Sequence, residues 1–76
     1  RTGGTKQLKK DLAAAEKRME KLDQLMEALN AEKEAAASDY QQLQELAEQE
    51  AEYTAEYDAL MEKWEVLSEA IAAEEG

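Results

Sequence analysis

The side chains in this sequence that are best placed to do chemistry are the positively charged ones near its start. Residues 1–21 contain seven of the nine basic residues and only three acidic ones, for a local net charge of +4. Lysine and arginine side chains bind phosphate groups, so this stretch predicts a contact for nucleic acid. The candidate binding residues are Lys6, Lys9, Lys10, Lys17, Arg18 and Lys21.

The remainder of the chain has the opposite charge. Residues 22–76 carry two basic residues against 16 acidic ones, and the whole chain has a net charge of −10. An acidic surface repels nucleic acid and anionic lipid, so any such contact would have to use the basic first third. A charged surface that is only solvated, and binds nothing, stays an open alternative.

Catalytic and metal-binding groups are the next candidates. The sequence has no histidine, no cysteine and no glycine-rich phosphate loop, and helical di-metal sites use Glu-x-x-His motifs. We therefore predict no catalytic, cofactor-binding or metal-binding residue in this chain. Because it does not begin with methionine, we expect it to be part of a longer protein.

The aromatic residues have two interpretations. Tyr53, Tyr57 and Trp64 fall on an apolar stripe, which favours core packing over the stacking of bases. Tyr40 lies off that stripe, next to the predicted turn. For Tyr40, packing at the tip is our first interpretation and contact with a partner our second.

Two heptad patterns predict the elements that position these groups. The apolar residues of the first follow alternating steps of four and three residues: Leu8, Leu12, Ala15, Met19, Leu22, Met26 and Leu29. The second has steps of three and four and one charged member: Leu43, Leu46, Glu50, Tyr53, Tyr57, Leu60, Trp64, Leu67 and Ile71. Such stripes are buried by packing helix against helix. The fold class is therefore all-α, a two-helix antiparallel coiled-coil hairpin.

The predicted boundaries follow from local signals. Residues 1–5 read as the end of a linker, with Thr5 as a helix N-cap, and residues 6–75 as the hairpin. Its first helix should span about 6–36, its turn about 37–39 and its second helix about 40–73. Ser38 with Gln41 resembles a capping box, and Asp39 suits a first helical turn. No glycine or proline marks the turn, so one continuous helix is the alternative.

Folding the stripes together gives a register in which facing residue numbers sum to 79. It places the largest seam residue, Trp64, opposite the smallest, Ala15, as close packing requires. The same register brings Arg18 near Glu56 and Asp11 near Lys63, and we expect Glu50 to reach Lys33 or solvent. It also sets the basic start of the first helix beside the acidic end of the second. Each cluster interacts unfavourably with the dipole of its own helix, and the attraction between the two clusters offsets this.

The partner predictions are limited. No apolar run approaches the roughly 20 residues of a membrane span, so we expect no membrane contact. A hairpin closed within one monomer is favoured, and a helix-swapped dimer that buries the same stripes stays possible.

Several residues resemble a known family. Ala-Ala-Ser38-Asp39-Tyr40 at the turn, Leu43-x-x-Leu46, and a late Trp64-Glu65-x-Leu67 are similar to the C-terminal coiled-coil domain of ABC-F ATPases, in particular the Uup-like subgroup. The resemblance covers nearly all of the chain after Gly3-Gly4. It implies a cytoplasmic parent protein with two fused ATP-binding cassettes that use ATP and Mg²⁺, and a non-catalytic hairpin.

The resemblance also implies a target for the parent, DNA or ribosomal RNA. It adds no catalytic residue, because the ATP-binding motifs of the family lie upstream of this domain. Two functions are therefore open for the hairpin. It contributes to nucleic-acid or ribosome binding, or it is a protein-interaction or spacer coiled coil without affinity for nucleic acid.

Overall fold

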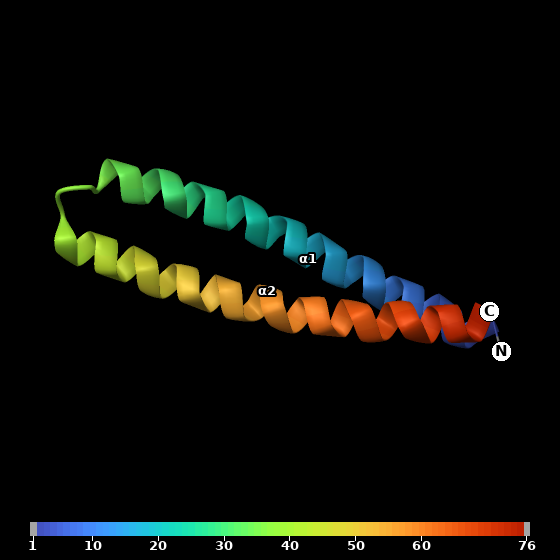
Figure 1. Cartoon of the computed structure of the whole chain (residues 1–76). Coiled ribbons are helices and arrows are strands. Elements are labelled where there is room, and N and C mark those ends of the chain that lie inside the picture. Colours follow the sequence, from blue (N-terminus) through green and yellow to red (C-terminus); the bar gives the residue numbers. More distant parts are fainter. Residues whose placement is uncertain (1, 76) are drawn as a thin grey trace.

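Two long helices form almost the whole of the computed structural model, which describes residues 2–75. Helix α1 spans Thr2–Ala35 and helix α2 spans Tyr40–Glu75. They run antiparallel and pack along their length, so that the start of α1 and the end of α2 lie at one end of a rod and the turn lies at the other (Figure 1). The Cα atoms occupy 58 × 14 × 14 Å. The predicted hairpin is thus confirmed, and the continuous helix is excluded.

Helix α1 begins earlier than the sequence indicated. Thr2 to Thr5 are helical, whereas the sequence predicts a helix start at about residue 6; Arg1 lies outside the described residues, and the assignment of residues 1–5 to a linker stays a prediction. Two glycines weaken a helix interior by about 1 kcal/mol each, but glycine, unlike proline, can still adopt helical geometry and accept a helical hydrogen bond at its carbonyl. Thr5, three residues before Leu8, is half-buried and extends the seam rather than capping the helix.

The N-cap of α2 is Asp39, not Ser38. The backbone N–H of Gln42 donates to Oδ1 of Asp39 over 3.1 Å, and the N–H of Leu43 donates to the Asp39 carbonyl over 3.0 Å. The predicted capping box at Ser38 and Gln41 is therefore replaced by a single N-cap bond one residue later, with the same three-residue spacing from Asp39 to Gln42. The N–H of Asp39 in turn donates to the carbonyl of Ala36 over 2.8 Å and closes the connection.

The seam, defined here as the two predicted heptad stripes, is where the helices meet. Every residue of both stripes is buried or half-buried. Among the residues whose burial the structure describes, the buried hydrophobic core consists of Ala15, Leu22, Leu29, Ala36 and Leu67. Leu22 has no exposed surface. The heptad pattern therefore identified the packing surface of each helix.

Contacts across the seam agree with the predicted register. The indole Nε1 of Trp64 donates to Oε2 of Glu16 over 2.9 Å, which places the indole beside the residue that follows buried Ala15. The hydroxyl of Thr54 lies 3.8 Å from the sulfur of Met26. Both pairs of residue numbers sum to 80, within one residue of the expected value.

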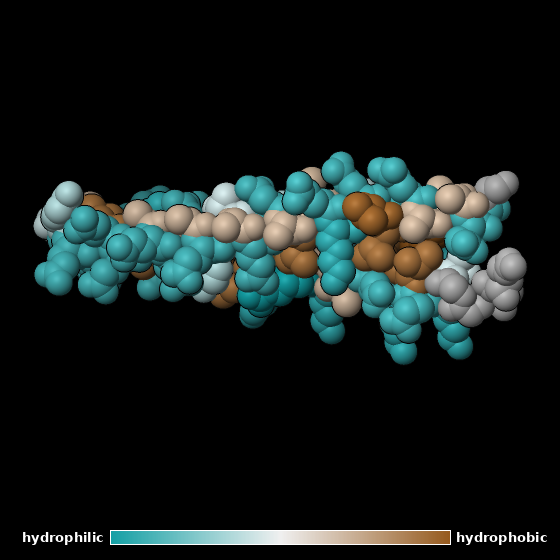
Figure 2. Space-filling model, turned by 90° about the horizontal axis from the view of Figure 1, so that it is seen from below, coloured by the Kyte–Doolittle hydropathy of each residue, from teal (hydrophilic) through white to brown (hydrophobic). Residues whose placement is uncertain are grey.

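The core is thin, and apolar surface stays exposed on α2. Tyr40, Met61 and Val66 are exposed, with Tyr40 at 78% and Val66 at 67%. On the face seen in Figure 2, weakly hydrophobic surface runs along the tip half and more strongly hydrophobic surface gathers toward the open end. Neither helix, over the residues described, is both long and apolar enough to cross a membrane.

Candidate nucleic-acid interface

The six candidate phosphate-binding residues all lie on the first six turns of α1, but they divide into two groups. Lys9 and Arg18 turn toward α2 and are paired with its carboxylates. The other four are exposed, and in the described part of the chain none of them is ion-paired; they are Lys6, Lys10, Lys17 and Lys21. We call these four the outer lysine row.

The outer lysine row occupies the side of α1 that faces away from α2. In the heptad defined by Leu8 and Leu12, its members take the b, c and f positions, which point away from a seam at a and d. Glu20 is the acidic residue that shares this side between Lys6 and Lys21. Glu16 lies instead on the flank, bonded to Trp64. The acids that interrupt the basic stretch in the sequence are thus largely separated from the row in space.

The outer lysine row has a length suited to contact with the sugar–phosphate backbone of nucleic acid. Fifteen residues at a helical rise of 1.5 Å give a length of about 22 Å, roughly two thirds of a turn of B-form duplex. A shallow hollow of about 240 Å³ lies at its inner end, lined by Lys17, Glu20, Lys21 and Gln24. The hollow thus groups two amines and an amide around the carboxylate of Glu20, so phosphate binding there would depend on the two amines outweighing one negative charge.

Arg18 and Glu56 form the strongest of the cross-helix ion pairs. Nε of Arg18 donates to one oxygen of Glu56 over 2.5 Å and a terminal nitrogen donates to the other over 2.9 Å, a bidentate geometry. This hydrogen bonding raises the pKa of Arg18 and lowers the pKa of Glu56 from their ordinary values. In this structure Arg18 therefore joins α1 to α2, and binding phosphate would require it to leave Glu56.

Two further ion pairs join the helices. Nζ of Lys9 lies 2.5 Å from Oε2 of Glu75 at the open end, as expected from the opposed charges there. Nζ of Lys33 donates to Oε1 of Glu50 over 2.5 Å, so the charged seam residue is neutralised as expected. The predicted neighbour pair of Asp11 with Lys63 does not form an ion pair in the described residues. Asp11 instead accepts from the amide of Gln7 over 3.0 Å, within its own helix.

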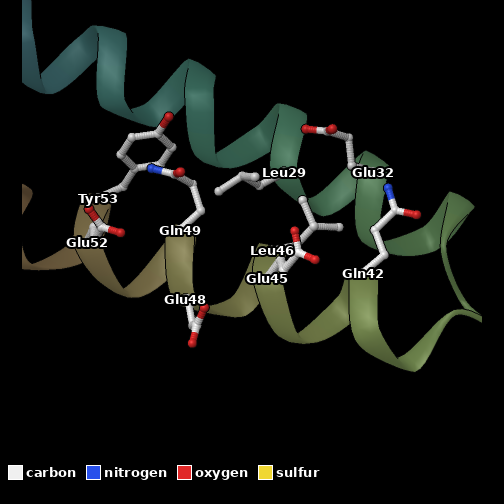
Figure 3. A pocket seen from close by; sticks show the side chains of 9 residues that line it. All are labelled: Leu29, Glu32, Gln42, Glu45, Leu46, Glu48, Gln49, Glu52 and Tyr53. Atoms are coloured by element: carbon white, nitrogen blue, oxygen red, sulfur yellow. The ribbon is translucent and has the colours of Figure 1, made fainter.

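The tip offers a different kind of surface. Tyr40 is largely in solvent, so the interpretation that it packs at the tip is wrong and contact with a partner stays a prediction. Beside the tip, a groove of about 510 Å³ that is open to solvent lies between the two helices (Figure 3). We call it the tip groove; its lining consists of Leu29, Glu32, Gln42, Glu45, Leu46, Glu48, Gln49, Glu52 and Tyr53.

Sequence reasoning missed both the tip groove and the Trp64–Glu16 bond. Lys33, which takes the next heptad position four residues after Leu29, was a signal that apolar packing weakens toward the tip, but the groove also depends on how far the helices separate there. Among residues 2–75, no group of three or more histidine, cysteine, aspartate or glutamate side chains is arranged to hold a metal ion.

Comparison with known proteins gives one match. The family described as ABC transporter C-terminal domain matches residues 4–69, a range that includes nearly all of α1, the turn and most of α2. No curated protein and no solved structure matches the chain.

Proposed function

Because this chain belongs to the ABC transporter C-terminal domain family, we propose that its hairpin helps a parent ATPase to hold nucleic acid. The domain is not the ATP-hydrolysing cassette, and its contribution is to binding. The finer assignment, to a cytoplasmic ABC-F ATPase of the Uup-like subgroup acting on DNA or ribosomal RNA, rests on the turn and tryptophan motifs of the sequence.

The observation that supports this proposal is the outer lysine row. Four exposed amines without carboxylate partners lie along one side of α1, so binding phosphate would break no ion pair of the hairpin. Lys9 and Arg18, by contrast, would have to leave Glu75 and Glu56 first. We therefore assign phosphate binding to Lys6, Lys10, Lys17 and Lys21 as a group.

The net charge of −10 opposes binding but does not forbid it. Helices with side chains are about 10 Å wide, so the outward sides of α1 and α2 are about 20 Å apart. The Debye length at physiological salt is about 8 Å, which screens most of the repulsion from the acids of α2. Approach along the α1 side is thus compatible with a short-range, salt-sensitive contact.

The test compares two variants with the same loss of charge on the same helix. One is Lys10→Gln/Lys17→Gln, in the row; its control is Lys9→Gln/Arg18→Gln, outside it. Binding of a labelled DNA duplex and of a ribosomal RNA hairpin is followed by fluorescence anisotropy over a salt series. The row variant should lower the slope of log affinity against log salt by about 2, one unit for each phosphate contact.

The control should change that slope by less than half as much. Absence of binding to either probe at about 50 mM salt would refute the proposal, because electrostatic affinity is highest there. Equal losses in the two variants would also refute it, since they would show that only the net charge matters.

A further inference from the structure

The charge of the hairpin is concentrated in its tip half. Residues 27–58 carry one basic and ten acidic residues, a net charge of −9, whereas the other 44 residues carry eight basic and nine acidic ones. The single base, Lys33, is paired with Glu50, and Glu56 is paired with Arg18. The remaining eight carboxylates of this half have no ion-pair partner in the described residues.

The tip groove lies within this acidic half and combines two kinds of surface. Buried Leu29 and half-buried Leu46 and Tyr53 supply an apolar floor between the helices. Exposed carboxylates from both helices border it, Glu32 from α1 and Glu45 and Glu52 from α2 (Figure 3). Glu48 points away from α1 in the same view. An apolar floor bordered by negative charge is therefore open to solvent between the two helices.

We propose that the tip groove binds a basic segment of another protein by accepting its lysine or arginine side chains. These side chains are amphipathic, with an aliphatic stem that packs on apolar surface and a cationic head that seeks carboxylates. Half-buried Leu46 fits the stem, and the ring of Tyr53 adds a face for cation–π contact. The carboxylates of Glu32, Glu45 and Glu52 fit the head. The volume of about 510 Å³ lies within the range of ligand pockets and accommodates such a side chain.

The charge distribution favours a basic protein segment over nucleic acid or a second hairpin as the occupant of the tip groove. A net charge of −9 over the tip half repels phosphate, so nucleic acid is confined to the outer lysine row at the other half of the rod. The same charge repels the tip half of a second hairpin. A cationic protein segment is complementary in both sign and shape, and exposed Tyr40 at the adjoining tip offers it further contact area.

The test uses the whole chain and an arginine- and lysine-rich octapeptide, with an octapeptide of glutamate as the negative probe. Titrations are followed by calorimetry and by backbone amide NMR. Glu45→Gln/Glu52→Gln removes two carboxylates from the groove. Its matched control, Glu65→Gln/Glu69→Gln, removes two exposed carboxylates from the same helix near its other end. Both double variants keep the seam intact, so both should fold.

We expect the basic peptide to shift amide signals around the groove, and the groove variant to weaken its binding about tenfold while the control weakens it less than twofold. Equal losses in both variants, or no binding of the basic peptide, would overturn the proposal. A DNA duplex that shifts the groove signals would overturn it as well. If the hairpins instead associate with one another, and Lys10→Gln/Lys17→Gln abolishes that association, the occupant is a second copy and the separate partner is refuted.

Discussion

Replacing Leu22 by alanine should remove about half of the stability of the hairpin. Leu22 is the largest side chain without exposed surface, and the change deletes three carbon groups worth about 0.8 kcal/mol each. Its neighbours on the seam, Met19 and Met26, are half-buried, so the cavity can fill by relaxation or solvent and adds little. We expect a loss of about 2–3 kcal/mol, set against roughly 4 kcal/mol at the low end for a chain of this size.

The measurement is urea unfolding followed by far-ultraviolet circular dichroism, with the fluorescence of Trp64 as a second probe. With a denaturant slope near 1 kcal/mol per M, the midpoint should fall by about 2 M. Val66→Ala is the control; because Val66 is 67% exposed, its effect should stay within about 0.5 kcal/mol. Alanine is at least as good a helix former as leucine, so a large loss reports packing. Similar midpoint shifts for both variants would refute the view that the seam holds the hairpin together.

Three further changes test the turn, the tip and the ion pairs. Asp39→Ala should cost about 1 kcal/mol in urea unfolding, because the first turn of α2 loses its capping acceptor, whereas Ser38→Ala should cost less than about 0.5 kcal/mol; the reverse order would contradict the assigned cap. Replacing Lys33 and Glu50 together by leucine should raise the melting temperature, because the apolar seam then continues toward the tip with no charge left unpaired, and a fall would show that the ion pair is needed there. Glu56→Gln should lower the melting temperature near neutral pH. Since ion pairing holds the pKa of Glu56 below its ordinary value of 4.5, its stabilisation is complete above that value and is lost as the pH falls through the lowered pKa. The difference from wild type should therefore vanish in strong acid, and a constant difference at every pH would refute the assignment.

The packing of this fold could be predicted from the sequence because it depends on a single repeated rule. A heptad stripe can be buried only against another helix, so the seam, the hairpin and the Arg18–Glu56 pair all followed from residue spacing. The volumes of Trp64 and Ala15 then fixed the register to within one residue. No long-range information beyond the stripes was needed.

The details that differed depend on small free-energy differences or on geometry. Ser38 and Asp39 are both good caps with a glutamine three residues later, and the sequence does not rank them. Thr5 is a suitable residue both for a helix N-cap and for a seam position. The two glycines before it do not show whether the helix begins before or after them. The tip groove depends on the separation of α1 and α2, which a one-dimensional pattern does not contain. Of the six basic candidates, only the structure separated paired Lys9 and Arg18 from the outer lysine row.

The shape of the rod makes it a lever. Both described ends, near Thr2 and Glu75, lie at one end, and the turn is remote from them on a body 58 Å long (Figure 1). A rotation of about 10° at the open end, well within the range of hinge motions, moves the tip by roughly 10 Å. Small tilts where the hairpin is held are thus converted into large displacements of the acidic tip. The outer lysine row begins near the pivot, and even Lys21 at its far end would move only about half as far as the tip during the same swing.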